Sequence, residues 1–167
     1  MADITLGGTP CKTSGELPSI GTKAPAFELR NDDLSPFHSS SLAGKRAILN
    51  VFPSVDTGVC AMSSRKFNAE ASALDNTVVA CISRDLPFAM KRFCGAEGLE
   101  DIKMLSDFST GKFGKDYGLE IVDGGFSGLH SRCVLVLDEN GTVIYSEQVP
   151  EIGQEPNYEA ALTAVKQ

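Results

Sequence analysis

Three nearly continuous apolar runs constrain the fold of this chain more than any other feature of its sequence. They are RAILNVF at residues 46–52, NTVVACIS at residues 76–83 and CVLVLD at residues 133–138. Such runs are typical of β-strands that are covered on both faces, because a strand with one exposed face alternates apolar and polar residues. The sequence therefore predicts a central sheet with helices on both sides.

The segments between and after these runs show helical spacing. A helix that starts near Cys60 places the following apolar residues on the same face as Cys60: Phe67, Ala71 and Leu74. Cys60 is therefore expected to face inward from the first turn. The segment 86–94 is expected to open a second helix, with Pro87 at an early position that helix starts tolerate. A last helix is expected over residues 157–167.

Two turn signals predict hairpins. Glycine and proline residues interrupt short runs of strand propensity in residues 4–17, which predicts an N-terminal hairpin. Asn140-Gly141 is a signal for a two-residue turn, which would make the flanking strands antiparallel neighbours. The order strand, helix, strand, helix, hairpin, helix predicts an α/β fold, a thioredoxin-like three-layer sandwich. In it, a central mixed β-sheet is flanked by helices and carries an added N-terminal β-hairpin.

Length and charge set further limits. The 167 residues contain no internal repeat or long linker, so residues 1–167 are expected to form one domain, large enough to fold without a cofactor or disulfide. A net charge of −7 argues against nucleic-acid binding. The N-terminus lacks the pattern of a signal peptide, and no segment has the length of a membrane span. We therefore expect a cytoplasmic protein that binds neither nucleic acid nor membranes.

The five cysteines do not have the pattern of a disulfide scaffold, because their number is odd and the chain is not small. They are Cys11, Cys60, Cys81, Cys94 and Cys133. A metal site is not expected either, since there is no C-x-x-C pair and the two histidines, His38 and His130, lie far apart in the sequence. In a reducing compartment such thiols are inert or catalytic.

The stretch before Cys60 holds the features that a reactive thiol needs. The thiolate is the nucleophile, and a thiol with the usual pKa of about 8.5 is mostly protonated at neutral pH. The start of the expected helix offers unpaired N–H groups and partial positive charge, and Thr57 offers a hydroxyl to the sulfur or to a substrate oxygen. Pro53 ends the buried strand and stiffens the approach. Cys60 is thus the candidate nucleophile; the alternative is a cysteine that only packs in the core.

Pro53, Thr57 and Cys60 match the signature P-x-x-x-T-x-x-C, and in this the chain resembles the peroxiredoxins. RDLPFAMKRFC and FCGAEGLED, which share Cys94, look like segments of the thiol peroxidase branch, the atypical two-cysteine type. Arg132 matches the arginine that these enzymes place beside the reactive sulfur. The similarity extends over essentially the whole chain.

The resemblance implies an antioxidant enzyme that reduces hydrogen peroxide or organic hydroperoxides without metal, haem or flavin. Cys60 would become a sulfenic acid, Cys94 would convert it into an intramolecular disulfide, and thioredoxin would reduce that bond. Pro53, Thr57 and Arg132 would hold the peroxide. A homodimer is also implied. Because Cys60 and Cys94 lie on two expected helices separated by a buried strand, the disulfide is expected to require local unwinding.

Two other functions remain open at this point. A disulfide oxidoreductase on the same fold is one, although the lack of a C-x-x-C pair argues against it, and a non-enzymatic peroxide sensor is the other. Cys81 and Cys133 lie in apolar strands and are expected only to pack. Cys11 lies in the expected hairpin, is expected to be more exposed and has no assigned role. Gly124-Gly125 lacks the setting of a phosphate site and is expected to belong to a flexible loop near the active site.

Overall fold

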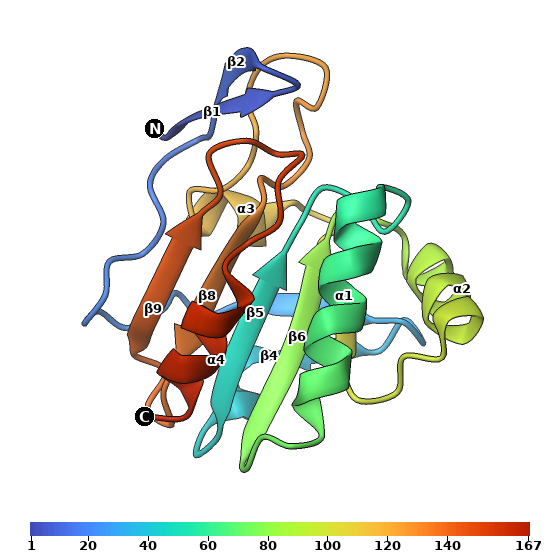
Figure 1. Cartoon of the computed structure of the whole chain (residues 1–167), viewed down its shortest axis with the longest axis vertical. Helices are drawn as coiled ribbons and strands as arrows, with labels where there is room; N and C mark the ends of the chain where they lie inside the picture. Colours follow the sequence, from blue (N-terminus) through green and yellow to red (C-terminus); the bar gives the residue numbers. More distant parts are fainter.

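The structure, a computed structural model that describes residues 1–167, is built on a seven-stranded sheet of order β4-β3-β7-β6-β5-β8-β9 (Figure 1). Its strands are β3 (Glu28–Asn31), β4 (Pro36–His38), β5 (Arg46–Val51), β6 (Thr77–Ser83), β7 (Lys103–Ser106), β8 (Cys133–Leu137) and β9 (Val143–Gln148). The helices are α1 (Gly58–Ala71), α2 (Pro87–Glu97), α3 (Lys112–Asp116) and α4 (Tyr158–Val165), with a 3-10 helix, η1 (Ser39–Leu42). The pairs β5–β6 and β6–β7 are parallel and the other neighbours antiparallel, so the sheet is mixed, as predicted.

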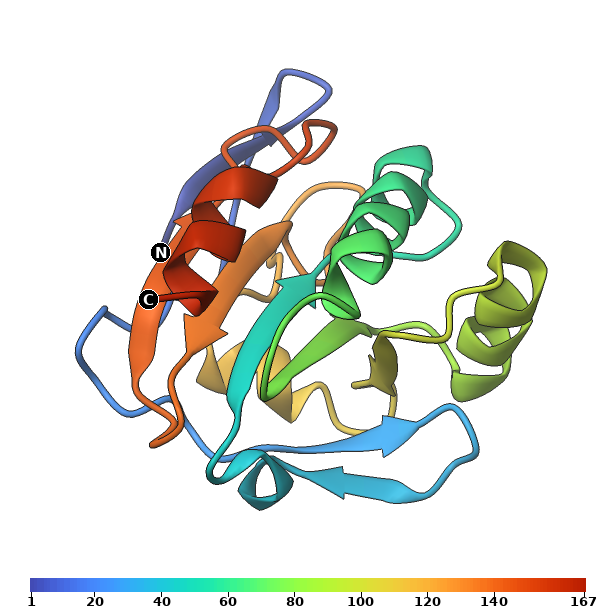
Figure 2. The same cartoon turned by 60° about the horizontal axis from the view of Figure 1, so that its bottom comes forward.

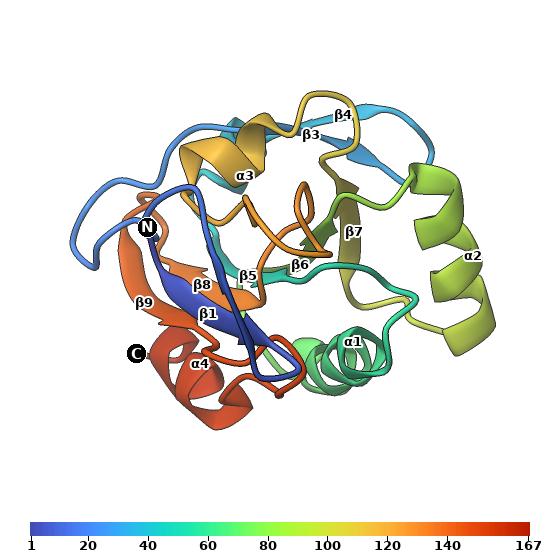
Figure 3. The same ribbon diagram turned by 90° about the horizontal axis from the view of Figure 1, so that it is seen from above.

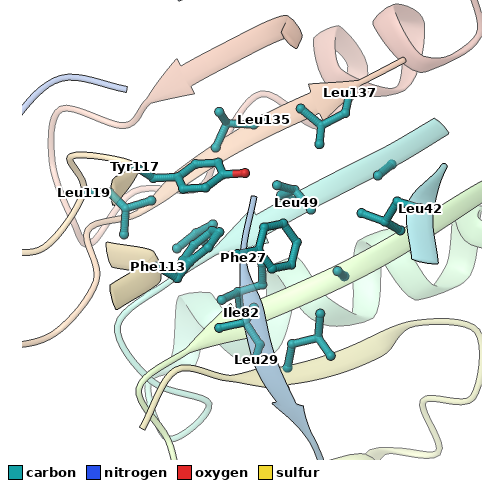
Figure 4. Close-up of a cluster of buried hydrophobic side chains, with 14 of the residues drawn as sticks. Phe27, Leu29, Leu42, Leu49, Ile82, Phe113, Tyr117, Leu119, Leu135 and Leu137 are labelled. Atoms are coloured by element: carbon teal, nitrogen blue, oxygen red, sulfur yellow. The ribbon is translucent and has the colours of Figure 1, made fainter. Parts of the chain in front are cut away.

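The three apolar runs form the three adjacent strands β6, β5 and β8 at the centre of this sheet. Successive side chains of a strand point to opposite faces, so each run supplies two cores. On one face, Ile48 of β5 and Val134 of β8 pack against α1 and α4. On the other face, Leu49 and Leu135 pack against Phe113 of α3 and its neighbours (Figure 4). The prediction of strands covered on both faces is confirmed.

Three helices cover one face of the sheet. Figures 2 and 3 show α1 and α4 beside each other on that face, with α2 further along near β7, and α3 on the opposite side. The expected helix starts are confirmed, since α1 begins at Gly58 and α2 has Pro87 in its first turn. The longest helix, α1, has 14 residues, and none is long and apolar enough to cross a membrane. The layers are those of a thioredoxin-like sandwich.

The N-terminal hairpin is present as a separate two-stranded sheet, β1 (Asp3–Leu6) and β2 (Thr9–Lys12). Cys11, which was expected to be more exposed than Cys81 and Cys133, is 5% exposed against 0% for both, but it is still buried. Cys11 lies directly opposite Ile4 in the hairpin, and both pack on Ile121 and Ile152. The hairpin thus has an apolar inner face of its own, and the cysteine lies on that face.

The hairpin β8–β9 is antiparallel as predicted, but its turn is wider than the expected two-residue turn. The Gly141 N–H donates to the Asp138 carbonyl, and the Asp138 N–H donates to the Thr142 carbonyl. Only Gly141, at φ 76°, has positive φ here, which fits a type I turn followed by a glycine bulge rather than a primed turn. The Asp138 carboxylate accepts the N–H groups of Asn140 and Thr142, both at 2.9 Å, and stabilises this form.

Candidate active site

Cys60 lies in the first turn of α1, as the helical spacing predicts. Thr57 is the N-cap residue, so Cys60 is the third residue of the helix. The side chain points inward and is 0% exposed, within an apolar cluster that includes Phe52 of the preceding loop and Met90 of α2. Backbone N–H groups of a first turn have no partner inside the helix, so they and the helix dipole favour negative charge at this position.

Two side-chain donors reach the Cys60 sulfur. The Thr57 Oγ1 lies 2.6 Å from Sγ, and the Arg132 Nη1 lies 3.2 Å from Sγ. The Thr57 hydroxyl is also 3.0 Å from the Ser54 carbonyl oxygen. Its single proton can therefore go to Ser54 when the sulfur is a thiol and to Sγ when it is a thiolate. The site accommodates both protonation states of Cys60 without a change in backbone.

Arg132 supplies a fixed positive charge to the sulfur. Its side chain, just ahead of β8, is only 2% exposed, and its Nε donates to the Ile152 carbonyl at 2.6 Å. The Arg132 carbonyl accepts the Val149 N–H at 2.9 Å and the Gln148 Nε2 at 3.0 Å, which fixes the backbone. No carboxylate pairs with the guanidinium. A buried cation that cannot deprotonate favours an anion beside it, and here that neighbour is the Cys60 sulfur.

Pro53 is buried in the loop between β5 and α1, where the strand has ended. It precedes Ser54, whose carbonyl accepts hydrogen bonds from the Thr57 N–H at 3.2 Å and from the Thr57 hydroxyl. The structure thus brings Thr57, Cys60 and Arg132 into direct contact, while Pro53 lies on the segment that leads to them. Its fixed φ limits the paths this segment can take.

Cys94 lies in α2 and is half-buried against the apolar cluster that contains Cys60. The two cysteines are not bonded, and all five cysteines of the chain are free. Burial, together with the charge of Asp32, raises the pKa of Cys94 to about 11. A thiol with that pKa is protonated at neutral pH, so Cys94 in this packed state is a weak nucleophile.

The other thiols lie apart from these donors. Cys81 is fully buried in the cluster behind Cys60, with its sulfur 3.6 Å from the Asn50 Nδ2, and burial raises its pKa to about 12. Cys133 is fully buried on the opposite face of the sheet, where burial likewise raises its pKa. Such thiols are inert as nucleophiles. Both positions agree with the expectation that these cysteines pack in the core.

Two contributors to the site have no signal in the sequence. The Ile152 carbonyl orients Arg132 through a backbone atom, and any residue can supply a carbonyl. Gln148, at the end of β9, holds the Arg132 backbone from across the β8–β9 pair. Only the register of the two strands brings this amide to Arg132. The loop that contains Gly124 packs on the hairpin, since Phe126 lies against the cluster that includes Ile4 and Cys11.

Comparison with known proteins gives the family. Residues 19–162 match the Redoxin family. The chain is 53% identical over 165 residues to proteins named thiol peroxidase from Mycobacterium tuberculosis and Mycobacterium bovis, with 99% of each chain covered. A peroxiredoxin-like protein from Aquifex aeolicus has a TM-score of 0.94 at 32% identity, covering 99% of this chain and 96% of its own. A thiol peroxidase from Chromobacterium violaceum shares the fold, with a TM-score of 0.91 at 21% identity. The match covers 99% of this chain and 96% of that protein's chain. This chain therefore belongs to the Redoxin family, as a peroxiredoxin enzyme that uses thiols to reduce peroxides.

Proposed function

We propose that Cys60 is the nucleophile of this peroxidase and that Thr57, Arg132 and Pro53 form its peroxide site. The observation that carries the proposal is the placement of two donors, the Thr57 hydroxyl and the Arg132 guanidinium, on one buried sulfur. Both stabilise a thiolate, and both are within reach of peroxide oxygens that approach it. Hydrogen-bond donors that are already positioned where negative charge develops in the transition state are a main source of catalysis.

The first chemical step follows from this arrangement. The Cys60 thiolate attacks one oxygen of the peroxide, so that an S–O bond forms while the O–O bond breaks. The departing oxygen carries the electron pair and takes up a proton, leaving as water or as an alcohol. Cys60 becomes a sulfenic acid. The Arg132 charge acts on the departing oxygen, where the negative charge grows.

The proposed second step uses Cys94. Its sulfur attacks the sulfenic sulfur of Cys60, which forms the Cys60–Cys94 disulfide and releases water. An external dithiol then reduces this bond and is itself oxidised to a disulfide. We propose thioredoxin as that dithiol, a homodimer as the assembly and the cytoplasm as the location, each from the similarity to peroxiredoxins and not from a contact in this chain.

The assignment of Cys60 is tested with Cys60→Ser. We expect this variant to keep the fold and to lose peroxidase activity, because a hydroxyl is close in size to a thiol but stays un-ionised at neutral pH. The measurement is peroxide consumption with a thioredoxin system, using Cys11→Ser as the matched control, which should turn over normally. Peroxide turnover by Cys60→Ser would defeat the proposal.

The assignment of Cys94 is tested with Cys94→Ser. The first reaction with peroxide should stay fast, but thioredoxin-linked turnover should be lost, because the sulfenic acid has no partner within the chain. A second peroxide would then oxidise Cys60 to a sulfinic acid. Intact mass after peroxide titration detects this product, which is two oxygen atoms heavier than the reduced protein. The same measurement distinguishes it from the disulfide. Normal turnover, or a wild-type disulfide that includes Cys81 or Cys133 instead, would show that Cys94 is misassigned.

A further inference from the structure

Asp85 joins the two loops that carry the reactive part of the chain. It follows β6, and its carboxylate reaches across to the loop between β5 and α1. One oxygen accepts the Ser54 hydroxyl at 2.8 Å, and the other accepts the Val55 N–H at 2.9 Å. The hydroxyl of Ser83, at the end of β6, donates to the second oxygen at 2.5 Å. Both oxygens of the carboxylate are therefore used, and the β5–α1 loop is held at two points.

The held loop leads directly to the Cys60 sulfur. The Ser54 carbonyl accepts the Thr57 N–H at 3.2 Å and the Thr57 hydroxyl at 3.0 Å. The same hydroxyl is 2.6 Å from the Cys60 Sγ. A continuous series of hydrogen bonds thus runs from Asp85 through Ser54 and Thr57 to Cys60. Asp85 itself has no hydrogen bond to the sulfur.

Two ordinary roles of an aspartate at this position do not apply. An acid next to a helix start commonly caps the helix, but the N-cap of α2 is Leu86, and no side chain caps that end. The neighbouring Arg84 donates to the carbonyls of Gly128 and Phe108, and Asp85 forms no ion pair. The carboxylate is engaged with the active-site loop instead.

We propose that Asp85 is a positioning residue for peroxide reduction, which acts by holding Ser54 so that the Thr57 hydroxyl is directed at the Cys60 sulfur and its peroxide. This inference rests on the proposed role of Thr57 in the peroxide site. Asp85 acts through geometry, since an anion near the sulfur would by itself disfavour the thiolate. Asparagine does not reproduce these contacts: with its oxygen toward the Val55 N–H, its NH₂ group faces Ser54, and the Ser54 hydroxyl loses the acceptor that holds it.

The first test compares two reactions of Cys60 in the Asp85→Asn variant. The stopped-flow rate with hydrogen peroxide should fall by about tenfold, since a small misplacement of a positioning group costs up to about 10²-fold in rate. Alkylation by iodoacetamide requires only the thiolate and should change by less than about threefold. Asp138→Asn is the matched control: that carboxylate also holds a loop through hydrogen bonds, from two backbone N–H groups, but at the far end of β8, and both rates should stay at the wild-type values. An unchanged peroxide rate in Asp85→Asn, or equal changes in both reactions, would overturn the inference.

The second test is a double-mutant cycle with Thr57→Val. If Asp85 acts through Thr57, Asp85→Asn/Thr57→Val should be no slower with peroxide than Thr57→Val alone, whereas independent residues would give additive losses. Additivity would overturn the inference. Ser54→Ala removes only the Ser54 hydroxyl that Asp85 accepts, so its rate with peroxide should fall by less than in Asp85→Asn while its alkylation rate stays the same. This variant replaces Asp85→Asn in the test if Asp85→Asn does not fold. A normal rate for Thr57→Val would contradict the proposed peroxide site, whereas a slow Thr57→Val beside a normal Asp85→Asn contradicts this inference alone.

Discussion

Arg132 contributes a charge and a geometry to the Cys60 sulfur, and two substitutions separate them. Arg132→Ala removes both, so the rate with peroxide should fall by about 10²–10³-fold, as for other single donors at a developing oxyanion. The rate of Cys60 alkylation at neutral pH should also fall, because the positive charge beside the thiolate is gone. Arg132→Lys keeps the charge but cannot contact the Ile152 carbonyl and the sulfur with one planar group. Arg132→Lys should keep most of the alkylation rate at neutral pH while remaining slow with peroxide. If Arg132→Ala changes neither measurement, the guanidinium has no part in the reaction.

At the same scale, the sequence predicted the residues around the sulfur but not the one that holds their loop. Thr57 precedes Cys60 by one helical turn, so local geometry alone brings the two together, and Arg132 was found through its resemblance to the family pattern. Asp85 contacts Ser54, 31 residues away, across two loops. The sequence does not show that β5 and β6 are neighbours, so an aspartate just before Leu86-Pro87 would be interpreted as a helix cap. The sequence does not show how deeply Cys11 is buried, because the burial of a short hairpin's inner face depends on what packs beneath it.

The N-terminal hairpin stabilises the loop around Glu151 and Ile152, whose Ile152 carbonyl orients Arg132. The carboxylate of Glu151 accepts the Gly153 N–H at 2.8 Å and the Gly8 N–H at 2.8 Å, so it ties the turn of the hairpin to its own loop. The next residue, Ile152, donates its N–H to Thr5 of β1 and offers its carbonyl to Arg132. The hairpin is thus connected to the active site through one short loop.

This connection predicts a pH dependence at the level of the hairpin. Hydrogen bonds, first from the Gly153 N–H and then from the Gly8 N–H and Thr5, lower the pKa of Glu151 to about 2, below its usual value of 4.5. A lowered carboxyl pKa means that the stabilisation is fully present above about pH 4.5 and is lost as the pH falls through 2. Amide NMR signals of Gly8 and Gly153 should therefore titrate near pH 2, and in Glu151→Gln this transition should vanish. A midpoint near 4.5 would show that these bonds do not persist in solution.

The elements predicted correctly are those with strong patterns. The three nearly continuous apolar runs predicted β5, β6 and β8, and the apolar face that begins at Cys60 predicted α1. Five elements were not predicted: β3, β4, β7, α3 and η1. They have three to five residues each, with sequences such as ELRN and PFH in which no period can be recognised. Their structure depends on pairing with the rest of the sheet and on the core that Phe27 and Phe113 form.

At the scale of the whole molecule, the active site and the main core lie on opposite faces of the sheet. The larger cluster, between the sheet and α3, contains 17 buried residues, with the rings of Phe27, Phe113 and Tyr117 in edge or stacked contact (Figure 4). The cluster that contains Cys60 and touches Cys94 has 9 buried residues and lies between α1 and α2. Because the two clusters lie on opposite faces of the sheet, we expect the first to stay intact when the second opens. The fold can therefore expose both cysteines without global unfolding.

The order in which the elements open can be predicted from the end of α2. Cys94 is in the last turn of that helix, where its carbonyl accepts the N–H groups of Gly98 and Leu99. Gly98 already has the left-handed backbone, at φ 68°, that ends the helix. By contrast, Cys60 is held by Thr57 and Arg132 within α1. Because no side-chain hydrogen bond fixes Cys94, α2 is expected to unwind from its C-terminal end if the proposed disulfide forms.

Hydrogen exchange on reduced and oxidised protein tests this division of the molecule. Formation of the Cys60–Cys94 disulfide should remove protection from the last turn of α2 and, to a smaller extent, from the first turn of α1, because two separately packed helices must bring their Cα atoms within about 7 Å. The amides of β5 and β8 should keep their protection, since the core on the α3 side is not disturbed. Peroxide-treated Cys94→Ser is the control: it is oxidised at Cys60 but cannot form the bond, so α2 should stay protected. Unchanged protection of α2 in a protein shown by mass to hold the disulfide would mean that the folded state already brings the two sulfurs together, and loss of protection in β5 or β8 would mean that the two clusters open as one unit.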